Sequence, residues 1–221
     1  MPDAATLLKF RRLLNDNKLG EALFAQVGAV LQGNGFQVKT GTIVDVTIIG
    51  APSSTKNAQK VRDPQMHQTR KGKQWYFGMK LHIGVDSQSG MTHSAVVTAA
   101  NVHDKHPLPE LLHDQEKRVY GDSAYASQKE LIHSKAAKAK DFTNQRTKRN
   151  GQIDEVAKAK NRNKSSIRAR VEHVFGVVKR PWGFGKVRYR GLRKNATRAF
   201  TAMALANIFL ARGTLMAQVR P

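Results

Sequence analysis

Residues 42–50 read TIVDVTIIG, and this stretch decides the fold class. Its many β-branched residues are typical of a buried β-strand. The exception is Asp45, which stands in the middle of the run. Burying one ionised carboxylate costs several kcal/mol unless a cation or hydrogen bonds compensate for it. Asp45 therefore lies either at a sheet edge that faces water or in a polar site, and the pattern leaves both interpretations open.

The segments that follow this strand predict a mixed α/β sheet. Residues 51–74 are polar and basic with little periodicity, which indicates an extended loop. Residues 75–101 hold two alternating segments joined at DSQSG, which predicts a β-hairpin. We expect a helix over residues 106–115, then a short strand that ends at Asp122 and a helix from about Ser127. Three adjacent strands joined to another through a helical crossover give a mixed sheet with helices packed on it.

Helical patterns flank this region on both sides. Asp3 is placed as the N-cap of a first helix, and a second helix is predicted over Glu21–Gln32. Lys138–Lys164 is basic and poor in large apolar residues, which indicates irregular structure. Helices are expected again over Lys164–Lys179 and from Asn195 to about Met216.

The net charge of +22 and the pI near 10.6 indicate a polyanionic partner, most simply nucleic acid. An anionic membrane surface is the competing partner. The chain has no cysteine, which excludes disulfides and thiolate metal sites. No apolar run reaches the roughly 18 residues that span a bilayer, and the start of the chain lacks a secretory cleavage site. We therefore expect a soluble cytoplasmic protein without a membrane partner.

Acidic residues become very rare towards the C-terminus. From Val156 to Pro221 the sole Asp or Glu is Glu172. Helical spacing places Glu172 beside Arg168, so a surface ion pair worth a few tenths of a kcal/mol is one interpretation. That pair would not account for the absence of every other acid nearby.

Asp45, Asp122 and Glu172 together indicate a metal site. Asp122 follows a strand, where ligand sites of α/β folds concentrate, although an Asp that caps the next turn is the plainer alternative. Carboxylates that converge in a basic protein would bind hard divalent cations. Two such ions can activate a water or a 3′-hydroxyl and stabilise the leaving oxygen in phosphodiester displacement.

Two other motifs remain open. His103 and His106 beside Asp104 would fit a zinc site, but a polar turn is the plainer interpretation. The stretch PWGFGKVRYRG (181–191) mixes aromatic rings and cations, which fits either base stacking or packing on the core. The rings in question are Trp182, Phe184 and Tyr189. No nucleotide-binding signature is present.

The chain resembles bacterial insertion-sequence transposases with a DDE active site, in particular family five. The resemblance runs in order through GTIVDVTIIGAPSSTKN, RDPQMHQTRKGKQWYFGMKLHIGVDSQSGMTHSAVVTAANVHD, YGDSAYAS and IRARVEHVFGVVKR…FGKVRYRGLRKN…ALANIFLAR. It implies a ribonuclease-H-like fold, with residues 1–38 as a partial helical region and residues 39–217 as the DDE catalytic domain.

The resemblance also implies an enzyme of DNA transposition, a form of DNA recombination. It assigns Asp45, Asp122 and Glu172 as catalytic metal ligands for Mg²⁺, with Mn²⁺ as a possible substitute, and gives phosphate-placing roles to Arg168 and Lys179. The enzyme would cut double-stranded DNA at the ends of a transposable element and join them to target DNA. Its expected partners are both DNAs and further copies of the chain, at the bacterial nucleoid. The full set of expected DNA contacts is Arg168, Lys179, Arg180, Lys186, Arg188, Arg190, Lys71 and Lys73.

The sequence departs from the family pattern in two places, and both bear on the predicted transposase function. Ser165 stands where relatives often have a Tyr that contacts terminal DNA. Relatives also have a longer helical region before the first residues, so we expect a shortened product. The alternatives are a catalytically inactive DNA-binding remnant, a metal-dependent nuclease without strand transfer, and a general RNA-binding protein.

Overall fold

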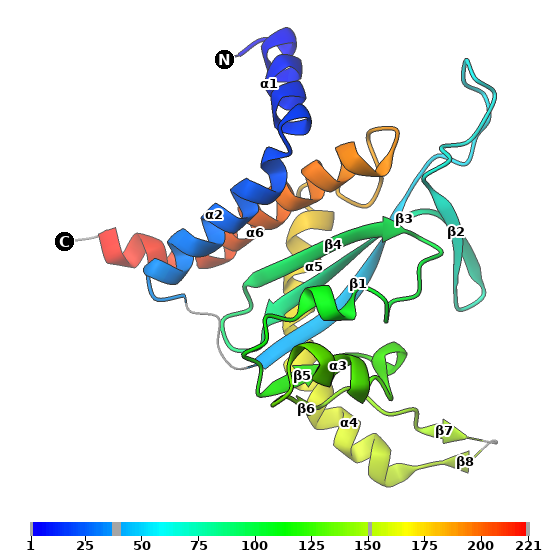
Figure 1. Cartoon of the computed structure of the whole chain (residues 1–221), viewed down its shortest axis with the longest axis vertical. Coiled ribbons are helices and arrows are strands. Elements are labelled where there is room, and N and C mark those ends of the chain that lie inside the picture. The colour runs from blue at the N-terminus through cyan, green and yellow to red at the C-terminus, as the bar shows by residue number, and fades with distance from the viewer. Residues whose placement is uncertain (1, 37–40, 150–151, 220–221) are drawn as a thin grey trace.

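The computed structural model describes residues 2–36, 41–149 and 152–219 (Figure 1). The helices are α1 (Ala4–Asp16), α2 (Leu19–Gly33), α3 (Lys129–Lys135), α4 (Glu155–Arg168), α5 (Arg170–Lys179) and α6 (Leu192–Val219), with short 3₁₀ turns η1 (Leu108–Leu111) and η2 (Ser123–Tyr125). The strands are β1 (Gly41–Gly50), β2 (His67–Lys71), β3 (Gln74–Asp86), β4 (Thr92–Ala99), β5 (Arg118–Tyr120), β6 (Lys140–Asp141), β7 (Lys148–Arg149) and β8 (Gln152–Ile153).

Strand β1 lies in the middle of the main sheet. Within the described residues the sheet has the order β2-β3-β1-β5-β6, and β4 pairs with β3 as well. β1 pairs antiparallel with β3 and parallel with β5, while β5 pairs parallel with β6. Ile43, Val44 and Ile49 are fully buried, as the β-branched run predicts. The mixed α/β sheet with flanking helices is thus confirmed.

The hairpin β3–β4 is confirmed, but the loop before it is more ordered than predicted. β2 lies within the segment expected to be an extended loop, and it pairs with the first part of β3. Its side chains are mostly exposed, so hydrophobic alternation could not reveal it. Backbone pairing with β3 alone makes it a strand, and together they form an arm that projects from the sheet (Figure 1).

Three helical predictions need correction. The helix expected over residues 106–115 is only the 3₁₀ turn η1, because Leu112 is already extended and the His113 N–H donates to the Glu116 carboxylate instead of to a helical carbonyl. The irregular segment expected up to Lys164 contains most of α4, whose N-cap Asp154 accepts a hydrogen bond from the Ala157 N–H. The single helix expected over Lys164–Lys179 is the end of α4 followed by α5.

Helix α5 packs on the sheet through the apolar stripe that its sequence predicts. Val171, Val174 and Val178 are fully buried and belong to the main hydrophobic core. Because these three side chains fix the rotation of α5, the position of Glu172 on the helix is fixed as well.

Helix α1 begins directly after its predicted N-cap, and α2 is confirmed within two residues of its predicted ends. The Asp3 carboxylate accepts a hydrogen bond from the Thr6 N–H, as an N-cap should. α2 packs along α6 (Figure 1). The predicted boundary between residues 38 and 39 lies outside the described residues.

Helix α6 departs from the expectation that no segment is apolar enough to cross a membrane. Among the described residues, Leu192–Ala217 is one helix whose length and mean hydropathy of 1.4 would suffice. In the structure its residues Ala199, Met203 and Ala206 are fully buried in the main core, and it contacts α2 and β4. It therefore serves as a core helix of this fold.

One buried polar side chain ties α6 to the sheet. Asn207 is 1% exposed, and its amide both accepts from the Thr92 N–H (2.9 Å) and donates to the Thr92 carbonyl (2.7 Å). We expect Asn207→Ala to lower the free energy of unfolding by about 2 kcal/mol, because two backbone groups of β4 lose their partners. Urea unfolding measures this loss. The matched control is Asn101→Ala at an exposed turn; an equal loss in both variants would contradict the assigned role of Asn207.

Candidate functional site

The register of the parallel strands brings Asp45 and Asp122 to neighbouring positions. β1 and β5 pair until Ile43 lies opposite Tyr120. Asp45 and Asp122 each follow two residues later, where β5 has ended. Both residues therefore follow the last paired residues of the two strands, and both line one pocket. The edge interpretation of Asp45 is wrong, because β1 is a central strand and Asp45 is 8% exposed.

Asp122 combines both roles that its sequence position allowed. Its carboxylate accepts a hydrogen bond from the Ala124 N–H (2.8 Å), so it caps η2. It also lines the same pocket as Asp45. The cap holds one carboxylate oxygen in place and thereby orients the side chain beside the pocket.

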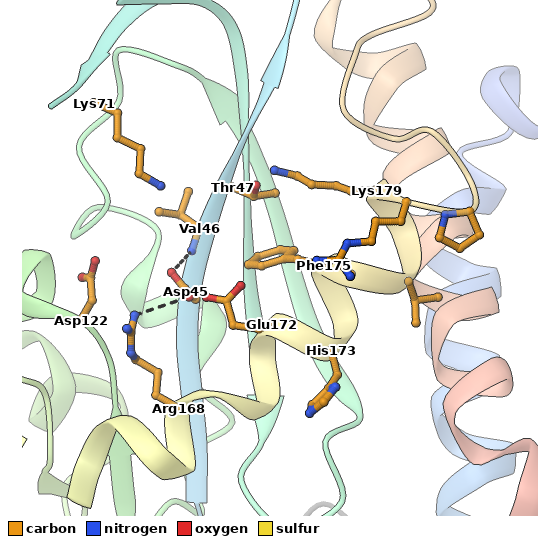
Figure 2. Close-up of a pocket in the computed structure, with 14 residues that line it drawn as sticks. Asp45, Val46, Thr47, Lys71, Asp122, Arg168, Glu172, His173, Phe175 and Lys179 are labelled. Atoms are coloured by element: carbon orange, nitrogen blue, oxygen red, sulfur yellow. Dashed lines mark hydrogen bonds and ion pairs between the residues drawn. The ribbon is translucent and has the colours of Figure 1, made fainter. Parts of the chain in front are cut away.

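Glu172 reaches this pocket from α5, on the other side of the Asp45 side chain from Asp122. Figure 2 shows the carboxylates of Asp45 and Glu172 pointing toward one another, with Asp122 farther to the side. The pocket has a volume of about 890 Å³, and we call it the carboxylate pocket. Its lining consists of Asp45, Val46, Thr47, Lys71, Asp122, Arg168, Glu172, His173, Phe175, Gly176, Val177, Lys179, Arg180 and Pro181.

The acidity of Asp45 is strongly perturbed by its surroundings. The pKa of Asp45 is raised to about 6, chiefly by burial, and the nearby charges of Asp122 and Glu172 contribute in the same direction. The Val46 N–H, which donates to Asp45 at 2.8 Å, and the Arg168 guanidinium act in the opposite direction. Near neutral pH this carboxylate therefore holds a negative charge that its protein neighbours compensate only in part.

Arg168 contacts Asp45 and forms no ion pair with Glu172 among the described residues, so the alternative of a surface ion pair along one helix is wrong. The Arg168 Nη1 atom lies 3.8 Å from the Asp45 Oδ2 atom, and the Arg168 Nε atom is buried without a partner among the described residues. The cause is the junction at Ala169, which ends α4 at Arg168 and places Glu172 on α5. The Arg168–Asp45 contact is long for an ion pair, so it neutralises Asp45 incompletely.

The donor set suits a hard divalent cation. Three carboxylates line one pocket, and carboxylate oxygens are the ligands that Mg²⁺ and Mn²⁺ take. The raised pKa of Asp45 adds an uncompensated charge that a cation would neutralise. In the part of the chain that the structure describes, however, no three His, Asp or Glu side chains stand close enough together to hold a metal ion. The pocket therefore has the right ligands without a closed cage around them.

The eight expected DNA-contact residues divide into two groups. Lys71, Arg168, Lys179 and Arg180 line the carboxylate pocket. Lys73, Lys186, Arg188 and Arg190 do not line it. Arg190 instead donates to Gln59 and to the Arg62 carbonyl, which ties the residue 181–191 segment to the loop after β1.

Lys179 has an unusual environment for a surface lysine. Partial burial lowers its pKa, the charge of Lys71 lowers it further, and Glu172 acts in the opposite direction. Lys71 comes from the arm of β2 and β3, whereas Lys179 ends α5. Two cations from distant segments thus face each other across the pocket, which favours an anionic group between them.

Sequence reasoning missed Thr47, His173 and Tyr125. Thr47 shares the face of Asp45 because it lies two residues further along the strand, so period-2 alternation could have identified it. His173 follows Glu172 directly. Tyr125 is fully buried, its hydroxyl has no hydrogen-bond partner among the described residues, and burial raises its pKa well above the ordinary value. No sequence signal separates such a tyrosine from an ordinary core residue.

The aromatic residues near residue 184 pack on the core. Phe184 is 1% exposed, and Trp182 packs against the same cluster. Tyr189 accepts a hydrogen bond from Arg11 at 3.2 Å, and the Arg11 guanidinium lies 4.4 Å from its ring centre. These contacts favour the packing interpretation over base stacking.

The histidines near Asp104 form no metal site among the described residues. The Asp104 carboxylate binds the Lys80 ammonium at 2.8 Å, and the rings of His103 and His106 are 6.4 Å apart. Lys80 already compensates the one acidic side chain of this motif.

Comparison with known proteins agrees with this geometry. A family model described as transposase DDE domain matches residues 36–208. Among solved structures, the chain is similar to the cryo-EM structure of a piggyBac transposase synaptic complex with hairpin DNA, with a TM-score of 0.53 and 10% sequence identity. That similarity covers 94% of this chain and 55% of the other, so the chain spans about half the length of that protein.

At such low identity the structural similarity bears on the fold alone, and it confirms the ribonuclease-H-like architecture expected from the sequence. The family model carries the classification, because it spans most of the sequence and includes Asp45, Asp122 and Glu172. The chain belongs to the transposase DDE domain family.

Proposed function

We propose that the chain is a DNA transposase of the insertion-sequence type, close to family five, that cleaves element ends and transfers them to target DNA. One observation carries the proposal. Asp45, Asp122 and Glu172, which come from three separate segments, line one pocket together with four cationic side chains. Acids and cations in one cavity suit a reaction that needs both metal ligands and phosphate contacts.

Within this proposal Asp45, Asp122 and Glu172 hold Mg²⁺, or Mn²⁺ in its place. When bound, the metal polarises the phosphodiester and lowers the pKa of a coordinated water or hydroxyl. The oxygen nucleophile bonds to phosphorus as the bond to the leaving oxygen breaks, and the leaving oxygen ends with the proton.

The cations of the carboxylate pocket position the DNA strand. Lys71 and Lys179 face each other across the cavity, so a phosphate between them would relieve their mutual repulsion. Arg168 holds Asp45 only loosely and its side chain is 27% exposed, so the guanidinium can also donate to a phosphate oxygen in the pocket. The family resemblance further implies action as an oligomer on DNA, at the bacterial nucleoid.

A second candidate is a DNA-binding remnant without cleavage activity. The observation in its favour is that Arg168 contacts Asp45 while the three carboxylates do not form a closed metal cage among the described residues. An arginine that stayed on Asp45 would keep the cation out.

The experiment incubates the purified chain with end-containing DNA and Mg²⁺, beside Asp122→Asn and Glu172→Gln. We expect nicked and joined products from the parent and a loss of about 10²–10³-fold in each variant, because each removes several kcal/mol of transition-state stabilisation. Binding should persist in both variants. Glu155→Gln at the exposed start of α4 is the matched control and should cleave normally.

The outcomes separate the candidates. Binding without cleavage under Mg²⁺ and Mn²⁺ would favour the remnant. Cleavage without joined products would favour a nuclease, and equal activity in the parent and both variants would contradict the assigned carboxylates.

A further inference from the structure

A second pocket lies at the opposite ends of the same strands. Its lining includes Gly41, which starts β1, Arg118, which starts β5, and Lys140, which starts β6. These are the amino ends of the parallel strands, whereas the carboxylate pocket includes Asp45 in the interior of β1 and Asp122 just after the carboxyl end of β5. The second pocket has a volume of about 610 Å³, and we call it the amino-end pocket.

The amino-end pocket is lined by cations from several segments and by no acid. The cationic residues are Lys117, Arg118, Lys138, Lys140 and Arg170. All five are exposed, and none forms an ion pair among the described residues. Five like charges that gather without a counter-charge oppose folding unless an anion accompanies them.

Glu116 and Asp141 adjoin pocket residues in sequence, but neither lines the pocket. Glu116 is 1% exposed, and its carboxylate accepts hydrogen bonds from the Thr42 hydroxyl and the His113 N–H. Asp141 accepts a hydrogen bond from the Thr143 N–H. Both carboxylates accept hydrogen bonds from other groups and neither lines the pocket, so its excess positive charge remains.

Two arginines are held in place by the protein. The Arg170 guanidinium donates to the Ser87 carbonyl, and the Arg118 guanidinium lies 5.7 Å from the centre of the Phe142 ring. Arg168 and Arg170 stand on either side of Ala169, yet Arg168 lines the carboxylate pocket and Arg170 lines the amino-end pocket. The junction of α4 and α5 therefore presents one arginine to each site.

We propose that the amino-end pocket binds the phosphate backbone of the same DNA duplex, away from the bond that is cleaved. The inference rests on the proposed function, because it takes DNA as the partner. Gly41 and Asp45 are four residues apart on β1, which corresponds to about 13 Å. With about 3.4 Å of helix axis per base pair, the bound phosphates lie at least about four base pairs from the cleaved bond.

Exposed lysines around an open pocket favour a polymer backbone over a small anion. A small anion needs a few fixed and desolvated donors, and the lysines here are solvent-exposed. Long flexible ammonium side chains suit a row of phosphates, whose binding gains from counterion release. Such contacts position the duplex without reading its sequence.

The test combines Lys117→Gln, Lys138→Gln and Lys140→Gln in one variant and measures its affinity for a duplex between about 50 and 200 mM salt. The slope of log affinity against log salt should become shallower by about 2–3, since each lost phosphate contact removes about 0.9. The control variant carries Lys9→Gln, Lys129→Gln and Lys160→Gln, which removes the same charge from exposed positions outside both pockets. Its slope should stay closer to that of the parent.

Hydroxyl-radical footprinting on the cleaved duplex locates the contact. We expect the pocket variant to lose protection only at sugars at least about four base pairs from the cleaved bond. Equal slopes for the pocket and control variants, while the parent binds and cleaves, would overturn this inference alone. Failure of the parent to bind the duplex at low salt would overturn the proposed function as well.

Discussion

Asp45→Asn is expected to abolish cleavage and, at the same time, to stabilise the folded chain. Burial raises the Asp45 pKa to about 6 from an ordinary 3.8, so the ionised side chain is costly in the folded state. Each pKa unit corresponds to about 1.4 kcal/mol, which gives a gain of up to about 3 kcal/mol at pH 8 for the neutral amide. Loss of the Arg168 contact reduces that gain.

The pH dependence of the stability difference between parent and Asp45→Asn shows whether the Asp45 charge causes that difference. Because the pKa of Asp45 is raised in the folded state, the protonated side chain adds to the free energy of unfolding. This contribution is complete below about pH 4 and is lost as the pH rises through about 6. His82 and His93 act in the opposite sense, since burial lowers their pKa values to about 4 and about 3 and their contribution is lost as the pH falls. Both proteins contain these histidines, so the difference between parent and variant isolates Asp45.

Urea unfolding of the parent and of Asp45→Asn at pH 8 and near pH 4.5 measures this difference. Asp16→Asn, which removes an exposed carboxylate that pairs with Arg12, is the control and should change stability by less than about 1 kcal/mol. If Asp45→Asn is less stable than the parent at pH 8, the uncompensated charge assigned to this position is wrong.

Addition of Mg²⁺ is expected to stabilise the parent at pH 8 and to have little effect near pH 4.5. Above its pKa of about 6 Asp45 is ionised and can bind the cation, whereas below it a proton competes. A cation present at 100 times its dissociation constant adds about 2.7 kcal/mol to the free energy of unfolding. Thermal unfolding with Mg²⁺, compared with the same ionic strength of Na⁺, measures the effect.

The same titration on Glu172→Gln provides the control for the site. Glu172 is exposed on α5, so its amide variant should fold normally while losing most of the Mg²⁺ effect. An equal Mg²⁺ effect in the parent, Asp45→Asn and Glu172→Gln would place the cation elsewhere on the molecule.

The sequence predicted the core of the fold because that core follows local patterns. The β-branched run in β1, the alternation in β3 and β4, and the valine stripe of α5 each bury one side of a regular element. β2 and η1 escaped prediction for the opposite reason. β2 exists through backbone pairing while its side chains face water, and η1 ends where Leu112 is extended and the His113 N–H donates to Glu116, a contact that helical periodicity does not show.

For the candidate site, the sequence identified the three acids but not their contacts. Asp45 was conspicuous because it interrupts an apolar strand, and Glu172 because its neighbourhood lacks acids. The partner of Arg168 depended on the break at Ala169, which helical periodicity cannot show. The amino-end pocket could not be predicted from the sequence either, because its lysines come together only after strands distant in sequence have paired.

Anomalous diffraction from crystals of the chain soaked in Mn²⁺ tests the central claim most directly. The account predicts a Mn²⁺ peak within about 2.0–2.6 Å of carboxylate oxygens from Asp45 and from at least one of Asp122 and Glu172, with Arg168 moved away from Asp45. A carboxylate pocket without a peak, in which Arg168 still contacts Asp45, would contradict it.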